Sequence, residues 1–118
     1  MVFYCTNCWK EIDENTQICP YCGADQVELD NEDFVTKLIR SLNHPEPTTP
    51  ILVANILADI KAVEAVPALL TKLKVEKDPF IIEALVKALL TLNPQTKNEI
   101  KKLIEPNIPI TIKDIFDN

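Results

Sequence analysis

Hydrophobic residues in the middle of the chain recur every three to four positions between residues 50 and 92. This spacing places them along one side of an α-helix, which completes a turn every 3.6 residues. Two such stripes precede a third segment, residues 79–92, which is apolar around most of its circumference and should be the most enclosed. The pattern predicts three consecutive helices that share a core. The first stripe consists of Leu52, Val53, Ile56, Leu57 and Ile60, and the second of Val63, Val66, Leu69, Leu70 and Leu73. Four leucines are expected to be almost fully buried: Leu57, Leu69, Leu85 and Leu89.

The apolar pattern also repeats along the chain. The spacing of the hydrophobic residues in Val35–Leu42 returns in Val66–Leu73, 31 positions later, and that in Val53–Ile60 returns in Leu85–Leu92, 32 positions later. A period near thirty residues, with one pair of helices in each unit, is typical of α-solenoids. The fold expected from the pattern is therefore mainly α.

Three short sequences in this region carry a more specific resemblance. They are AVPALL from Ala65 to Leu70, the dipeptide Asp78-Pro79, and EALVKAL from Glu83 to Leu89. Together they resemble the short HEAT-like repeats of phycobilisome lyases over about residues 32–105, which implies an α-solenoid of about two repeats and some five helices. Those repeats often have Gly-Asp after the first helix, whereas this chain has Asp59-Ile60-Lys61 and must make the turn without glycine.

All four cysteines lie near the N-terminus, in two CxxC pairs separated by ten residues. Each pair can hold one side of a metal ion, and two facing pairs complete a tetrahedral site, so the expected ligands are Cys5, Cys8, Cys19 and Cys22. The alternative is two disulfides, which we expect less because the chain has the character of a cytoplasmic protein, whose thiols stay reduced. A segment this short cannot build an adequate core, so metal binding should supply its folding free energy.

The residues around the cysteines favour zinc. The sequence CPYCG at residues 19–23 resembles the knuckles of small prokaryotic zinc ribbons, in which Gly23 fits a left-handed position after the cysteine. Trp9 stands at the equivalent place after the first pair, where that family usually has glycine; it should pack over the site or against the helices, or remain a partly exposed aromatic. The same spacing resembles the rubredoxin-like module of rubrerythrins, which holds iron. Zinc is preferred because nothing else in the sequence is a redox site.

Composition limits the function. The 118 residues include 47% hydrophobic and 25% charged side chains, as in a globular protein, and neither a membrane span nor a signal peptide is expected, so the predicted location is the cytoplasm. The net charge is −6; four thiolates would add −4 and a zinc ion +2, which gives about −8. That acidity weighs against binding to a phosphate backbone.

The remaining segments have structural explanations. Asp30 or Asn31 is expected to cap a helix that runs to Leu42, and His44 to be a surface residue. The lysines near the ends of later helices are explained by favourable interaction with the helix dipole. Alternating isoleucines in residues 108–112 indicate an extended piece that packs on the helices, on the ribbon or on another chain.

The predicted organisation is a zinc ribbon over residues 1–29, HEAT-like helical repeats over residues 30–106 and an aliphatic tail over residues 107–118. The favoured function is a non-enzymatic, zinc-binding adaptor or scaffold whose helical surface binds a protein partner, with a homodimer contact expected through the C-terminal region. The alternatives are a nucleic-acid-associated ribbon protein in transcription or translation, and an iron-containing electron-transfer module.

Overall fold

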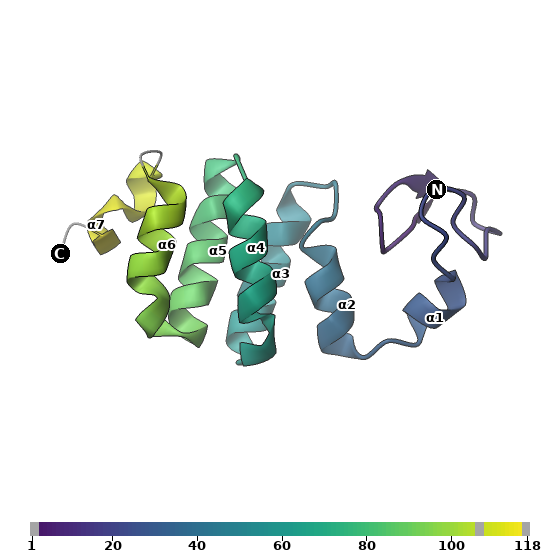
Figure 1. Cartoon of the computed structure of the whole chain (residues 1–118), viewed down its shortest axis with the longest axis horizontal. Helices are drawn as coiled ribbons and strands as arrows, with labels where there is room; N and C mark the ends of the chain where they lie inside the picture. The colour runs from purple at the N-terminus through teal and green to yellow at the C-terminus, as the bar shows by residue number, and fades with distance from the viewer. Residues whose placement is uncertain (1–2, 106–107, 117–118) are drawn as a thin grey trace.

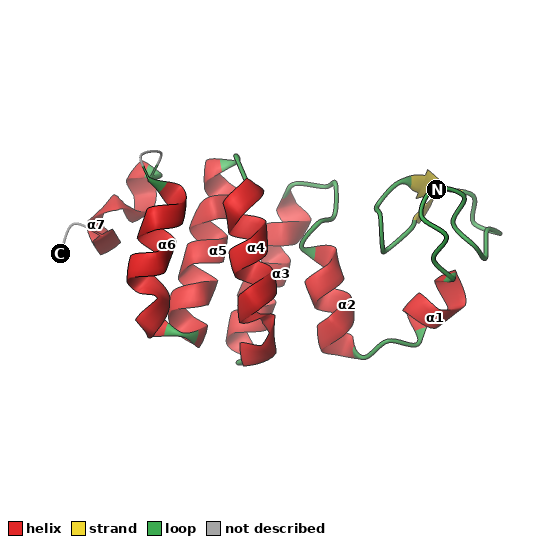
Figure 2. Ribbon diagram, in the orientation of Figure 1, coloured by secondary structure: helices red, strands yellow, loops and turns green. Residues whose placement is uncertain are grey.

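The three helices predicted for the central region are present in the computed structural model, which describes residues 3–105 and 108–116. They are α3 (Thr48–Asp59), α4 (Val66–Val75) and α5 (Pro79–Leu92). Proline lies in the first turn of each helix, where its missing N–H removes no intrahelical hydrogen bond. The described chain is mainly helical, with a small N-terminal ribbon (Figure 2).

Shorter elements flank these helices on both sides. A two-stranded antiparallel sheet joins β1 to β2 in the ribbon, with Phe3 opposite Ile12 and Tyr4 opposite Glu11. The remaining elements are β1 (Phe3–Tyr4), β2 (Glu11–Ile12), α1 (Gln26–Asp30), α2 (Phe34–Ser41), α6 (Lys97–Ile104), α7 (Lys113–Phe116) and three 3₁₀ turns at Val63–Ala65, Pro94–Thr96 and Ile110–Ile112.

The helices form two layers in an elongated molecule that measures 52 × 24 × 21 Å. Consecutive helices from α2 to α6 run antiparallel, with α4 and α6 in front of α3 and α5 (Figure 1). Helix α5 packs on both α3 and α4, α6 packs on α4, and α2 packs on α3. The ribbon lies at one end of this stack and α7 at the other (Figure 1). Among the described residues, no helix has both the length and the apolar character needed to cross a lipid bilayer.

The core of the stack is centred on α5, as the sequence predicted. Seven of its side chains are buried, because α5 is covered by α3 and α4. The four residues expected to be almost fully buried, Leu57, Leu69, Leu85 and Leu89, each have 0% exposure, which confirms that prediction.

Three residues assigned to the buried stripes are instead exposed, which is a correction to the predicted helical phase. Leu52 is 60% exposed, Ile60 46% and Val63 59%. The buried face of α3 is formed by Pro50, Val53, Ala54 and Leu57, at steps of three, one and three residues. At 100° per residue, Pro50 and Leu57 lie near the centre of that face and Val53 and Ala54 at its margins, so Leu52 falls on the opposite side of the helix. Ile60 and Val63 lie beyond the end of α3.

The acidic segment after the ribbon folds into two short helices, so the prediction of one helix capped by Asp30 or Asn31 is wrong. Asp25 caps α1 and Asp33 caps α2, each accepting a hydrogen bond from a backbone N–H two or three residues later. Asn31 instead ends α1. The sequence contains several acidic residues that can cap a helix, and the Asp33 cap is the one followed by the apolar face of α2.

The C-terminal segment is not extended, as the alternating isoleucines had suggested, but forms a 3₁₀ turn and α7. Ile112 and Phe116 are buried against the helix stack, whereas Ile110 is 87% exposed. Thr111 adds a hydrogen bond of 2.9 Å to the Glu83 carboxylate. The segment therefore packs on the helices, which was one of the expected placements. The predicted boundary at residues 106–107 lies outside the described residues.

Candidate metal centre

Two loops of the same construction carry the four cysteines. In the first, the N–H of Trp9 donates to the Cys5 carbonyl at 2.7 Å, and in the second the N–H of Gly23 donates to the Cys19 carbonyl at 2.9 Å. Gly23 has φ 79° and Trp9 has φ 61°, so both occupy the left-handed region. The tryptophan thus makes the turn that glycine usually makes, although its Cβ makes this conformation less favourable.

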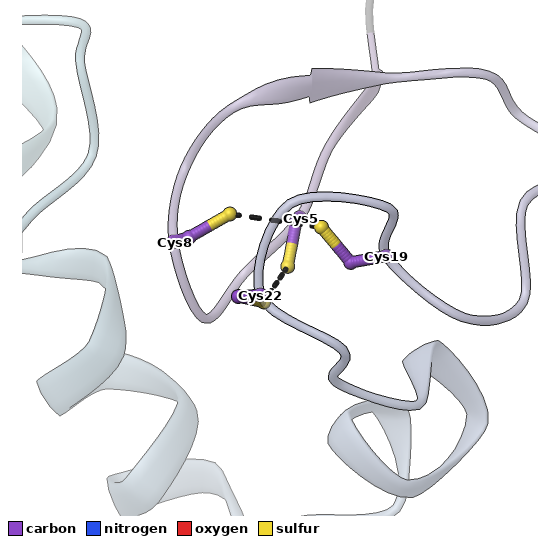
Figure 3. Close-up of side chains that lie close together, drawn as sticks. All are labelled: Cys5, Cys8, Cys19 and Cys22. Atoms are coloured by element: carbon purple, nitrogen blue, oxygen red, sulfur yellow. Dashed lines mark hydrogen bonds between the residues drawn. The ribbon is translucent and has the colours of Figure 1, made fainter.

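The four cysteine sulfurs converge on one point between the loops (Figure 3). All four ligand atoms lie within 4.8 Å of one another, with Cys5 and Cys22 at 3.6 Å and Cys8 and Cys19 at 3.7 Å. A tetrahedron with metal–sulfur bonds of about 2.3 Å has edges of about 3.8 Å, which agrees with both separations. The residues present therefore fit a tetrahedral four-thiolate ion, and none of the four is in a disulfide.

Hydrogen bonds prepare one thiol of the first loop for ionisation. Burial opposes the thiolate of Cys5, but N–H groups from the Cys8 backbone and the Gln26 side chain outweigh it and lower the pKa of Cys5 from 9.0 to about 6. The Gln26 amide nitrogen lies 3.3 Å from the Cys5 sulfur. A thiolate is the form that binds a metal ion, so these hydrogen bonds favour the ligand form of Cys5.

Neighbouring sulfurs and hydrogen bonds also shift the pKa values of Cys8 and Cys22. The backbone N–H of Lys10 favours the thiolate of Cys8, but desolvation and the sulfurs of Cys19 and Cys22 outweigh it and raise the pKa of Cys8 to about 11. A hydrogen bond from Asn7 lowers the pKa of Cys22. A cation among the four sulfurs would relieve this competition, and binding would release protons.

The ribbon has little apolar core of its own. Its buried residues are Cys5, Cys19 and Leu29, with Cys8, Ile12 and Ala24 partly buried around them. Leu29 belongs to α1, so the predicted domain boundary after residue 29 falls inside this helix. A core this small is consistent with a segment whose folding requires a bound ion.

Trp9 connects the ribbon to the helices. Its indole N–H donates to the main-chain carbonyl of Arg40 at 2.9 Å, and its ring lies 4.8 Å from the ring of His44. Tyr4 approaches His44 from β1, with ring centroids 5.5 Å apart. Of the placements expected for Trp9, packing against the helices is the one observed. His44, expected at the surface, is half-buried in this contact.

Sequence reasoning found the four cysteines and missed the residues that surround them. Asn7, Gln26 and Arg40 hydrogen-bond to the cysteines or to the loops that hold them. Asn7 lies between two cysteines, which is the one local signal available. Arg40 is 33 residues away from Asn7, and nothing in the sequence brings the two together.

Comparison with known proteins identifies residues 4–26 as a zinc-ribbon domain. This match includes all four cysteines and ends where α1 begins. No curated protein and no solved structure matches the chain.

Proposed function

We propose that this chain is a non-enzymatic, zinc-binding adaptor whose helical stack binds a protein partner and whose ribbon forms a rigid cap on one end. The observation that carries the proposal is a groove between α2 and α4. Ile39 of α2 and Pro67, Ala68 and Val75 of α4 supply its apolar lining. Val75 is 68% exposed, so part of this apolar lining is open to a partner.

Charge indicates the kind of partner. The segment 66–77, which includes α4, contains three lysines and one glutamate. Lys72 lines the groove, where its ammonium is paired with Glu76 at 2.9 Å. An apolar protein segment flanked by acidic residues would cover the groove and meet the excess positive charge around it.

The HEAT-like interpretation is part of this proposal. Two layers of antiparallel helices with a sequence period near thirty residues are what short helical repeats produce, and such stacks present long surfaces to partner proteins. Four reduced thiols suit the cytoplasm, which we propose as the location.

Nucleic-acid binding through the ribbon is disfavoured by charge. Residues 3–33 contain eight acidic side chains, and Lys10 is their one cation. A zinc ion bound by four thiolates makes this end more negative still. A surface of this sign repels the phosphate backbone, whereas nucleic-acid-binding domains present clustered lysine and arginine.

Zinc is the metal that we propose, because the matched domain is a zinc ribbon and four thiolates in a tetrahedron suit this ion. Elemental analysis of protein purified without oxygen from the native host tests the assignment. One equivalent of zinc and a colourless solution are expected. A red protein that contains iron would replace the zinc assignment with the electron-transfer alternative.

Affinity capture from a lysate of the source organism, followed by mass spectrometry, tests the adaptor proposal. Val75→Glu places a negative charge in the groove and should remove the captured partner, while the helical signal in circular dichroism stays unchanged. Val63→Glu is the matched control, because Val63 is similarly exposed but does not line the groove. Equal capture by both variants would show that the groove is not the binding surface.

A further inference from the structure

Asn7 uses both ends of its side-chain amide, one toward the metal centre and one toward the helices. Its Nδ2 donates to the sulfur of Cys22 at 3.4 Å, and its Oδ1 accepts from Nη1 of Arg40 at 2.8 Å. The orientation of the amide follows from these partners, because the reverse would set two donors against each other at the guanidinium. One side chain therefore links a predicted ligand to α2.

Arg40 is itself fixed in place. Its guanidinium makes a two-pronged contact with the Glu32 carboxylate, in which Nη2 lies 3.0 Å from Oε2. Its main-chain carbonyl accepts the indole N–H of Trp9. Arg40 thus holds two residues of the first cysteine loop, one through its side chain and one through its backbone. Charged hydrogen bonds with two parallel prongs are among the more directional contacts in proteins.

The first loop owes its shape to few other contacts. Two-residue strands and a core of three buried side chains supply little stability of their own, so we expect its conformation to depend on an ion at the cysteines. If the loop loses that shape, Asn7 and Trp9 no longer meet Arg40. Because linkage is reciprocal, contacts that hold the loop on α2 must also favour the ion-bound form.

We propose that Asn7 and Arg40 are positioning residues that couple metal occupancy of the four-cysteine site to docking of the ribbon on α2. Both residues also line the groove between α2 and α4, so occupancy sets the form of one wall of that groove. The coupling itself does not depend on the proposed partner.

Competition for zinc between the full chain and a chromophoric chelator tests the coupling. Asn7→Ala should weaken zinc binding about tenfold or more, as is typical when a residue that orients a ligand is removed. Arg40→Ala, which touches no cysteine, should weaken it several-fold. The control is Lys37→Ala, which removes an exposed cation from the same helix and should leave affinity unchanged.

The double variant distinguishes a shared contact from two separate ones. If Asn7 and Arg40 act together, replacing both should weaken zinc binding no more than the larger single effect. Effects that add in free energy, or an Arg40→Ala variant with unchanged zinc affinity, would overturn the proposal. Arg40 lies outside the ribbon, so its variant remains informative even if Asn7→Ala prevents the first loop from folding.

Trp9 supplies a direct readout, because it is the one tryptophan in the chain. Removing zinc should shift its fluorescence to longer wavelength as the indole leaves Arg40 and His44, while most of the far-UV helical signal remains. Asn15→Ala, an exposed asparagine in the same ribbon, should behave like the unmodified protein. Unchanged tryptophan emission after zinc removal would show that docking does not depend on the metal.

Discussion

Replacing Leu57 by alanine tests the helical core and the corrected phase of α3 together. Leu57 has 0% exposure and lies on the face of α3 that packs on α5. Removing three buried carbon groups forfeits about 2.4 kcal/mol at about 0.8 kcal/mol for each. The cavity left behind adds to this loss, so the expected destabilisation is about 3–5 kcal/mol. A small domain is stable by only about 5–15 kcal/mol, so this change should be conspicuous.

Leu52→Ala provides a control with the same chemistry on the same helix. Leu52 is 60% exposed, so its truncation should cost less than about 1 kcal/mol. Chemical denaturation followed by far-UV circular dichroism, with zinc present, measures both values. A loss of about 3 kcal/mol should also lower Tm by roughly 12–24 °C in a stack of this size. Equal destabilisation by the two substitutions would refute the assigned phase of α3.

Three further predictions concern the metal site, an acid-sensitive contact and the C-terminal end. Cys19→Ser should abolish tight zinc binding in chelator competition, because it removes one of four ligands; retained affinity would exclude Cys19. Lys87 and Thr111 lower the pKa of Glu83 below 4.5, so its contribution to stability is complete above that pH and is lost as pH falls through the lower folded-state value. Glu83→Gln should therefore flatten the dependence of Tm on pH in the acid range, and an unchanged acid limb would contradict this. Ile110→Lys should reduce any homodimer detected by light scattering without lowering Tm, because the side chain is 87% exposed; a dimer of unchanged strength would place the contact elsewhere.

The sequence was most informative where a short-range rule determines the structure. Periodic leucines and prolines at helix starts placed α3, α4 and α5 within a few residues, and the four buried leucines followed from the same period. The spacing of the cysteines placed four sulfurs together, because each CxxC pair forms its own loop. Within each helix and within each CxxC pair, the residues that determine the structure lie within about one turn of each other.

Sequence reasoning was least informative where neighbouring residues offer equivalent choices. Three aspartates lie in the segment before α2, and each could cap a helix, so the choice of Asp33 depends on where the apolar face of α2 meets α3. The isoleucines near the C-terminus alternate as in a strand, yet β1 and β2, the strands among the described residues, lie in the ribbon at the opposite end of the molecule. These residues form a 3₁₀ turn instead, which buries Ile112 against the helix stack.

In two turns that lack glycine, a residue with a side chain adopts the left-handed backbone conformation instead. Lys61, with φ 58°, follows α3, and it is exposed to solvent. Trp9, with φ 61°, takes the corresponding place in the first cysteine loop. The sequence revealed both departures from glycine, but the conformation that each residue adopts depends on the contacts that the folded chain offers.

The use of tryptophan at this turn has an energetic explanation in the contact with the helices. A left-handed conformation costs a residue with a Cβ about 1–2 kcal/mol relative to glycine. The hydrogen bond from Trp9 to Arg40 contributes about 0.5–1.5 kcal/mol to stability, and the ring contact with His44 contributes a similar amount. Glycine could make neither contact. The local strain is thus offset by docking, and the residue that departs from the zinc-ribbon pattern is the one that attaches the ribbon to the helical stack.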